Sequence, residues 1–139
     1  MLNCYLAGAM SQYLIEDGKI DRAVAWRKEI LRGLEDSNIR IFDPTLKFQY
    51  NQFYDLDGIL PQNRLYLEKC DILVLNLTYL EYSPGTMYEI SVASYLNKPI
   101  IAFGDSKWFT YAHVKSMVTI RFDSVEDVCE YLHNMYCQL

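Results

Sequence analysis

The sequence predicts an α/β protein with a doubly wound sheet of five parallel strands. Short apolar runs alternate along the chain with longer segments whose apolar residues recur at helical spacing. The run at residues 72–75 is apolar without interruption, as a parallel strand buried on both faces requires. A helical segment follows most strands and can carry the chain across to the next parallel strand.

The first half of the chain supplies two strands and two helices. Strands are predicted at residues 3–7 and 39–42, and helices at 19–36 and 58–69. Both strands are short apolar runs, and the second ends at Asp43-Pro44. The first helix has apolar residues at helical intervals, namely Ile20, Ala23, Val24, Ile30, Leu31 and Leu34. Loops are expected at 8–18 and 45–57, the second rich in Tyr and Phe.

The second half supplies three strands and two helices. Strands are predicted at 71–77, 99–103 and 118–122, helices at 85–97 and 125–136, and a loop from residue 104. Pro84 and Gly85 interrupt the extended chain, and Thr86 can cap the helix that follows. Ile90, Ala93 and Leu96 give that helix its core face. Together these elements make residues 1–139 one domain with a flavodoxin- or Rossmann-like sheet.

The composition is that of a soluble globular protein with one core. A chain of 139 residues can bury one substantial core and is too short for two. No apolar run approaches the roughly 20 residues that cross a bilayer. The apolar residues 1–9 lack the basic segment of a signal peptide, so they are interpreted as a strand. We therefore expect a cytoplasmic protein without membrane attachment.

Charge and motifs exclude several classes of function. A net charge of -5 argues against a nucleic-acid polymer as partner, although it permits binding of a small phosphate. Four scattered cysteines without a CxxC pair, and only two histidines, argue against a metal site. Cys4 and Cys70 are predicted to be small core residues. The chain has no GxGxxG, GxxxxGK[ST] or GxSxG motif, and we expect no cofactor.

Glu89 is the main catalytic candidate. It lies about one turn inside the helix at 85–97, which follows the buried strand at 71–77. In an open α/β sheet this location is the carboxyl end of a central strand, where ligands bind. The helix dipole favours the ionised carboxylate, and an ionised, partly enclosed carboxylate can be a nucleophile. A solvated helix Glu that only complements the dipole is the alternative.

The loops at the carboxyl ends of the strands should converge on one pocket. These loops are 8–18, 43–57, 78–85 and 104–111. They bring polar, carboxylate and aromatic side chains together, namely Tyr5, Met10, Asp43, Phe48, Tyr50, Tyr54, Ser83 and Glu89. Flat aromatic walls suit a planar ligand such as a nucleobase. Asp43 is a candidate proton donor by location alone.

Several motifs occur in a fixed order along nearly the whole chain. They are Tyr5-Leu-Ala-Gly8, Trp26-Arg27, Phe42-Asp43-Pro44, Asn63, Cys70-Asp71-Ile72, Ser83-Pro-Gly-Thr-x-x-Glu89-Ile-x-x-Ala93-Ser94 and Lys98-Pro99-Ile100. This set resembles the nucleoside 2-deoxyribosyltransferase superfamily. It is closest in motif to the members that hydrolyse nucleoside 5'-monophosphates, such as the N-glycosidases of CMP and deoxynucleotides.

The resemblance implies an enzyme with a covalent mechanism. The residue matched by Glu89 attacks the anomeric carbon of a nucleoside or nucleotide, expels the base and holds the sugar as an ester. Another base or water then completes the reaction. Tyr5 matches the tyrosine that orients this nucleophile, and Asn63 matches a position that contacts substrate. Core packing for Tyr5 and a helix-surface position for Asn63 are the alternatives.

Ser83 occupies the position that divides the family. Transferases that act on free deoxynucleosides usually carry Asp six residues before the nucleophile, and monophosphate hydrolases carry Ser. A hydroxyl and the amides at a helix start, here near Gly85 and Thr86, donate to a phosphate that a carboxylate would repel. A role for Ser83 in capping the turn alone is the alternative.

Other substrate contacts are implied less directly. Gly8, Met10 and Ser11 follow the first strand, where the family often has a Ser- or Arg-rich phosphate segment. Three helical arginines can substitute for that segment, namely Arg22, Arg27 and Arg64. Arginines on helices are usually solvated. The family completes its site from a neighbouring subunit, and here the segment 108–117 with His113 matches. A homodimer or larger assembly with shared sites is therefore expected.

Three functions remain after this reasoning. The first is an N-glycosidase of nucleoside 5'-monophosphates. The second is a 2-deoxyribosyltransferase that exchanges bases between free deoxynucleosides. The third is a nucleotide-binding module without turnover, which a pocket carboxylate with its desolvation penalty disfavours.

Overall fold

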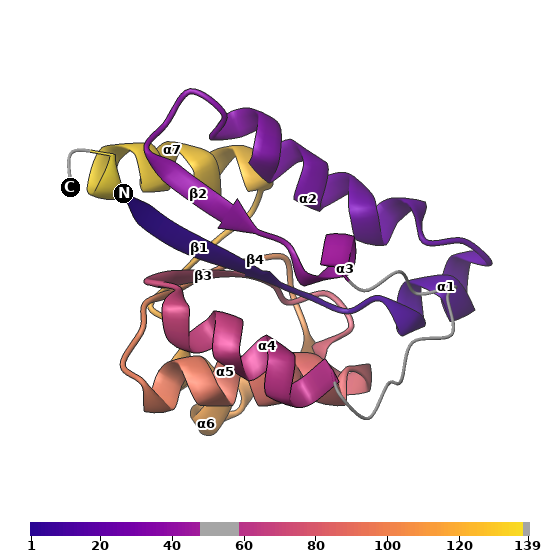
Figure 1. Cartoon of the computed structure of the whole chain (residues 1–139). Helices are drawn as coiled ribbons and strands as arrows, with labels where there is room; N and C mark the ends of the chain where they lie inside the picture. The colour runs from indigo at the N-terminus through magenta and orange to yellow at the C-terminus, as the bar shows by residue number, and fades with distance from the viewer. Residues whose placement is uncertain (48–58, 138–139) are drawn as a thin grey trace.

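The computed structural model describes residues 1–47 and 59–137, and its five strands form one parallel sheet (Figure 1). The strands are β1 (Leu2–Ala7), β2 (Ile39–Phe42), β3 (Ile72–Asn76), β4 (Ile100–Phe103) and β5 (Ile120–Phe122). Their order in the sheet is β2-β1-β3-β4-β5, and every neighbouring pair is parallel. The predicted fold class is confirmed.

Helices cover both faces of this sheet. They are α1 (Ser11–Asp17), α2 (Asp21–Gly33), α3 (Pro44–Lys47), α4 (Ile59–Lys69), α5 (Pro84–Tyr95), α6 (Ala112–Met117) and α7 (Val125–Tyr136), with the short 3₁₀ helices η2 (Leu80–Tyr82) and η3 (Lys107–Thr110). Figure 1 shows α2 and α7 on one face and α4, α5 and α6 on the other. The described residues contain no helix that combines the length and apolarity needed to span a bilayer.

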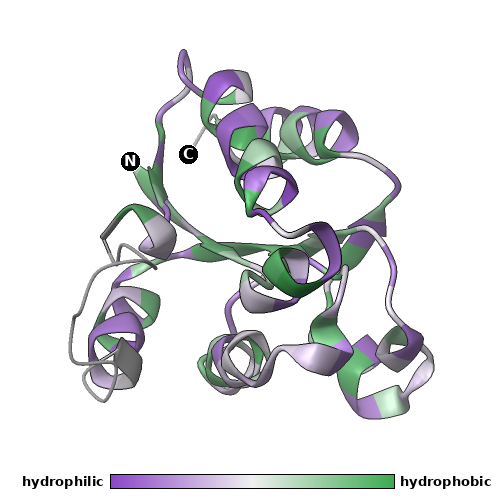
Figure 2. Ribbon diagram, turned by 90° about the vertical axis from the view of Figure 1, so that its right-hand side faces the viewer, coloured by the Kyte–Doolittle hydropathy of each residue, from purple (hydrophilic) through white to green (hydrophobic). Residues whose placement is uncertain are grey.

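Each face of the sheet has its own apolar core. Trp26 and Ile30 of α2 pack with Val128 and Leu132 of α7 against one face. Leu67, Ile90, Ala93 and Val114, from α4, α5 and α6, pack against the other face. In Figure 2 the apolar colour accordingly follows the sheet and the inner sides of the helices. Cys4 and Cys70 are buried as free thiols in these two cores, which confirms their predicted packing role.

Four segments predicted as loops contain helices. Residues 8–18 contain α1, residues 45–47 belong to α3, residues 78–85 contain η2, and the loop from residue 104 contains η3 and α6. The helix α1 has only seven residues, too few to show a clear helical period, and its stability comes from tertiary contacts. Asn76 Nδ2 donates to the Tyr13 hydroxyl at 2.9 Å, and Gly18 ends the helix with a left-handed φ of 72°.

Lys98 joins the turn after α5 to the end of α4. Its ammonium group donates to the carbonyl oxygens of Leu67 and Glu68, each at 2.8 Å, and to that of Cys70. Leu67 and Glu68 lie in the last turn of α4 and Cys70 follows it, so the cation satisfies carbonyls at the helix end and complements the helix dipole. The carboxyl end of α4 is thereby held by the turn that follows α5.

Candidate active site

A pocket of about 270 Å³ lies at the carboxyl ends of β1 and β2, beside the start of α5. The chain order of the sheet reverses between β1 and β3, and folds of this kind bind ligands at the carboxyl ends of the strands near that reversal. Its volume is near the lower end of the roughly 300–1,000 Å³ usual for small-molecule sites. The wall is formed by Gly8, Ala9, Met10, Ser11, Gln12, Arg27, Pro44, Thr45, Asn63, Tyr82, Ser83, Pro84, Gly85, Thr86 and Glu89.

Most of the predicted site residues line this pocket. Those on the wall are Gly8, Met10, Ser11, Asn63, Ser83, Gly85, Thr86 and Glu89. Tyr5 lies behind the wall, Asp43 is buried in an ion pair, and His113 is exposed on α6 away from the pocket. The loop at 104–111 was expected to reach the site and contributes nothing to its described wall. The predicted aromatic residues Phe48, Tyr50 and Tyr54 lie outside the described residues.

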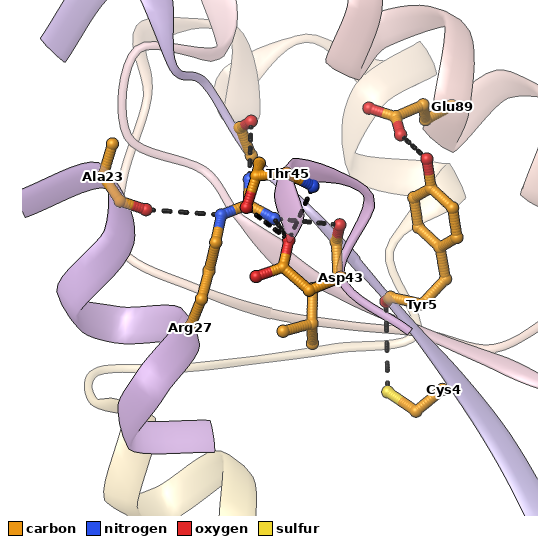
Figure 3. Close-up of polar contacts among 9 residues, drawn as sticks. Cys4, Tyr5, Ala23, Arg27, Asp43, Thr45 and Glu89 are labelled. Carbon is orange, nitrogen blue, oxygen red and sulfur yellow. Dashed lines mark hydrogen bonds and ion pairs between the residues drawn. The ribbon is translucent and has the colours of Figure 1, made fainter. Parts of the chain in front are cut away.

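Tyr5 and Glu89 form a buried hydrogen-bonded pair (Figure 3). The Tyr5 hydroxyl, on β1, donates to Glu89 Oε2, on α5. Tyr5 is fully buried, and its ring packs 5.5 Å from that of Phe42. Burial and the nearby Glu89 charge raise the pKa of Tyr5, so its hydroxyl remains a donor. The carboxylate is therefore fixed on one oxygen, and the other is available to the pocket.

Glu89 is less acidic than the helix dipole alone predicts. The side chain is only 8% exposed, and burial raises its pKa from 4.5 to about 7. The hydrogen bond from Tyr5 and the positive charge of Arg27 act in the opposite direction, and Asp43 adds to the increase. The helix dipole favours the ionised form, but the desolvation of the buried carboxyl group outweighs this effect.

Arg27 and Asp43 form an ion pair in the floor of the site. Arg27 Nη1 lies 2.9 Å from Asp43 Oδ1, and both side chains are almost completely buried. The same Asp43 oxygen accepts from the backbone amide and the hydroxyl of Thr45, so Asp43 caps α3 directly before Pro44. The predicted role of Asp43 in substrate binding is therefore replaced by an internal one. Arg27 is not the solvated helix arginine that was expected.

The start of α5 presents unpaired donors to the pocket. Ser83 occupies the N-cap position, but its hydroxyl lies 2.7 Å from that of Thr86 and caps no backbone amide. Thr86 is the third helical residue, so its predicted capping role is wrong. Among the described residues, the amides of Gly85 and Thr86 have no acceptor. A side chain at Gly85 would meet no atom within 4 Å, so space is open beside these amides.

Asn63, on α4, contributes an acceptor to the wall of the pocket. Its side-chain oxygen is buried and has no hydrogen-bond partner among the described residues. Unpaired buried polar atoms are rare in folded proteins, so this oxygen is suited to a donor on a ligand. The other two arginines considered for phosphate are engaged at the surface, Arg22 with Asp17 and Arg64 with Glu68. No cluster of metal-ligating side chains occurs within residues 1–47 and 59–137.

Seven residues of the wall were not among the predicted site residues. They are Ala9, Gln12, Arg27, Pro44, Thr45, Tyr82 and Pro84. A signal for Arg27 was present, because it stands on the same helical stripe as Ala23, Ile30 and Leu34. A cation on an apolar stripe requires a buried partner. The sequence Asp43-Pro44-Thr45 is likewise a helix start, with an N-cap residue before Pro.

Comparison with known proteins gives matches in structure alone. No protein-family model matches the sequence, and a search of curated proteins gives no match. The 2-deoxyribosyltransferase of Bacillus psychrosaccharolyticus superposes with a TM-score of 0.70 at 17% identity, over 93% of this chain and 91% of that one. The corresponding enzyme of Leishmania mexicana gives 0.67 at 16% identity, over 98% and 99% of the two chains.

A third solved structure carries the other activity suggested by the motifs. The CMP N-glycosidase BcmB of Clostridium botulinum gives a TM-score of 0.62 at 14% identity, over 95% of this chain and 98% of that one. All three superpositions run along nearly the full length of both chains. The chain therefore has the fold of the nucleoside 2-deoxyribosyltransferase superfamily, which its sequence motifs resemble.

Proposed function

We propose that the protein is an enzyme that cleaves the N-glycosidic bond of a (2'-deoxy)nucleoside 5'-monophosphate and releases the free base. The observation that carries this proposal is the buried Glu89 carboxyl, held by Tyr5 and placed on the wall of a pocket. A carboxylate fixed in this way is a nucleophile for an anomeric carbon. The shared fold with a 2-deoxyribosyltransferase and a CMP N-glycosidase supports the same reaction class.

The reaction proceeds in two displacements. The free oxygen of Glu89 attacks the anomeric carbon, and the bond from that carbon to the base nitrogen breaks. The base leaves with the electron pair and takes up a proton, while the sugar remains as an ester of Glu89. Water then attacks the same carbon, the ester bond breaks, and the Glu89 carboxylate is regenerated with release of a proton. The Tyr5 hydrogen bond stabilises the carboxylate at the start and at the end of this cycle.

The start of α5 supports a 5'-phosphate as part of the substrate. The free amides of Gly85 and Thr86 are donors, one hydroxyl of the Ser83–Thr86 pair can donate as well, and the positive end of the helix dipole lies there. A phosphate accepts hydrogen bonds from donors of this kind. Asp43 is held as an acceptor by Arg27 and Thr45, so we do not assign it the protonation of the leaving base.

A panel of substrates tests the proposal. The protein is incubated with nucleosides and their 5'-monophosphates, with and without an added acceptor base, and free and exchanged bases are separated by chromatography. We expect base release from a monophosphate, without a requirement for the acceptor. Faster transfer to a base than to water, from free deoxynucleosides, would establish the transferase instead. Tight nucleotide binding without any base release would identify a binding module.

A homodimer with shared sites accompanies this proposal. Tyr82 lines the pocket and is still 55% exposed, and the exposed Leu46 and Leu65 lie on the two helices that supply Thr45 and Asn63. Apolar side chains around a site mouth suit a subunit interface. We expect a dimer or larger assembly in sedimentation velocity, with His113 facing the neighbouring subunit's pocket. A strictly monomeric protein with full activity would contradict the shared site.

Replacing Tyr5 with Phe should change the pH dependence of the reaction. The hydrogen bond from Tyr5 lowers the pKa of Glu89, so its loss raises that pKa above about 7. Because the nucleophile must be ionised, the acid limb of kcat/KM should move to higher pH. The loss of one charge-assisted hydrogen bond predicts a shift of about one to two pH units. An active Tyr5→Phe variant with an unmoved acid limb would show that Tyr5 only packs.

A further inference from the structure

Arg27 is held entirely by acceptors of the protein. Its Nε donates to the carbonyl of Ala23 at 3.3 Å, and its Nη2 donates to that of Gly8 at 3.0 Å. Its Nη1 donates to the carbonyl of Leu6 at 3.2 Å and to Asp43 at 2.9 Å. The guanidinium also lies over the ring of Trp26, 4.5 Å from its centre. Although Arg27 lines the pocket, four hydrogen bonds prevent it from swinging toward a ligand.

These bonds fix two walls of the pocket relative to each other. The Leu6 and Gly8 carbonyls lie at the end of β1. Leu6 is one residue beyond Tyr5 in the chain, and Gly8 is three residues beyond Tyr5. Asp43 follows β2 and caps α3, whose first residues form another part of the wall. A side-chain carbon at Gly8 would come within 2.9 Å of Trp26, so the chain end is packed directly on the helix that carries Arg27. Figure 3 shows this network beside the pair of Tyr5 and Glu89.

The charges of the pair also bear on Glu89. Among the described residues, the buried charged side chains are Arg27, Asp43 and Glu89. Arg27 favours the ionised form of Glu89 and Asp43 opposes it. An arginine without its partner would keep the carboxylate ionised, but it would also repel the positive charge that develops on the sugar. The pair as a whole is neutral and avoids this conflict.

We propose that Arg27 and Asp43 act together as a positioning pair for the nucleophile, because they fix the end of β1, the strand that carries Tyr5, and Tyr5 binds Glu89. This inference rests on the proposed function and deepens it. The pair joins the ends of β1 and β2, and each member offsets the electrostatic effect of the other on Glu89. The groups that set the ionisation of Glu89 are then Tyr5 from β1, Arg27 from α2 and Asp43 from the start of α3.

Opposite shifts from the two single variants test this role. In Asp43→Asn the side-chain oxygen can still accept from Arg27 and Thr45, while the negative charge is lost. We expect Glu89 in this variant to titrate at lower pH, by on the order of one pH unit. In Arg27→Gln the titration should move to higher pH, and in the double variant it should return toward that of the wild type. The titration is followed by ¹³C NMR of the labelled Glu89 carboxyl, with thermal melting as the check of folding.

A matched control and a second readout separate the outcomes. Arg22→Gln removes an exposed arginine from the start of the same helix, and it should leave the titration of Glu89 unchanged. The acid limb of kcat/KM should follow the NMR titration in each variant. If the wild type releases no base, the proposed function fails, while the NMR titrations still test the pair. A folded Asp43→Asn variant whose Glu89 titrates unchanged, or at higher pH, would overturn the positioning pair.

Discussion

The Glu89→Gln variant is expected to lose base release by on the order of 10⁴-fold or more. The substitution removes the nucleophile and keeps the shape of the side chain, whose amide oxygen can still accept from Tyr5. Turnover is measured by chromatography of the free base. Mass spectrometry of the wild type with a slow substrate should show a glycosyl adduct on Glu89 and none on the variant. Near wild-type turnover of Glu89→Gln would refute the covalent mechanism.

The same variant should be more stable than the wild type at high pH. The pKa of Glu89 is raised in the folded state, from 4.5 to about 7, so the folded protein binds a proton more tightly than the unfolded chain. The wild type therefore loses stability as the pH rises through this interval, and the variant does not. Above pH 7 the difference in unfolding free energy should reach about 3 kcal/mol at most. Denaturant unfolding of the wild type and of Glu89→Gln at pH 5 and pH 9 measures this difference. The same difference between the two proteins at both pH values would contradict the raised pKa of Glu89.

The Ser83→Asp variant is expected to reverse or erase a preference for monophosphates over nucleosides. A negative charge beside a phosphate costs on the order of 1–4 kcal/mol at an effective dielectric of about 20 or above. The ratio of kcat/KM for the two substrate classes should therefore fall by about 5-fold to 1,000-fold. Ser83→Ala should lose about 1.5–3 kcal/mol, the value of one charge-assisted hydrogen bond. An unphosphorylated nucleoside should be affected little by either change.

Ser91→Asp is the matched control for this substitution. It adds the same charge to the same helix at an exposed position, where the serine hydroxyl bonds only to the Met87 carbonyl. Its preference for monophosphates should stay close to that of the wild type. A wild type that favours free deoxynucleosides and transfers the sugar to an added base would identify a 2-deoxyribosyltransferase. The role of Ser83 would then be limited to stabilising the turn before α5.

The fold was predictable because its information is local. Each buried strand appears as an apolar run, and each crossover helix has its own apolar stripe. The topology of such sheets then places the ends of β1 and β3 together, which brings the position of Glu89 to the pocket. The contact of Tyr5 with Glu89, 84 residues away along the chain, came from the family resemblance. No periodicity in the sequence connects these two residues.

The remaining features depend on the assembled protein. The ionisation of Glu89 is governed by how completely its neighbours exclude water, and no local pattern contains that quantity. The pairing of Arg27 with Asp43 joins residues from different elements, so each residue alone suggested a different role. The short helix α1 depends on Tyr13 and its contact with Asn76. Helical periodicity cannot identify a helix of two turns.

The shape of the pocket depends on Lys98, a residue outside it, through the hydrogen bonds of its ammonium group. It secures the last turn of α4, whose opposite half carries Asn63 and the unpaired oxygen on the pocket wall. A helix moves as a rigid rod, so a displacement of its carboxyl end also moves Asn63. The orientation of Asn63 therefore depends on the position of the turn that holds Lys98, which lies outside the pocket. Substitutions of residues around Lys98 are therefore expected to change the shape of the pocket wall, and with it the substrate range, without placing a new side chain in the pocket.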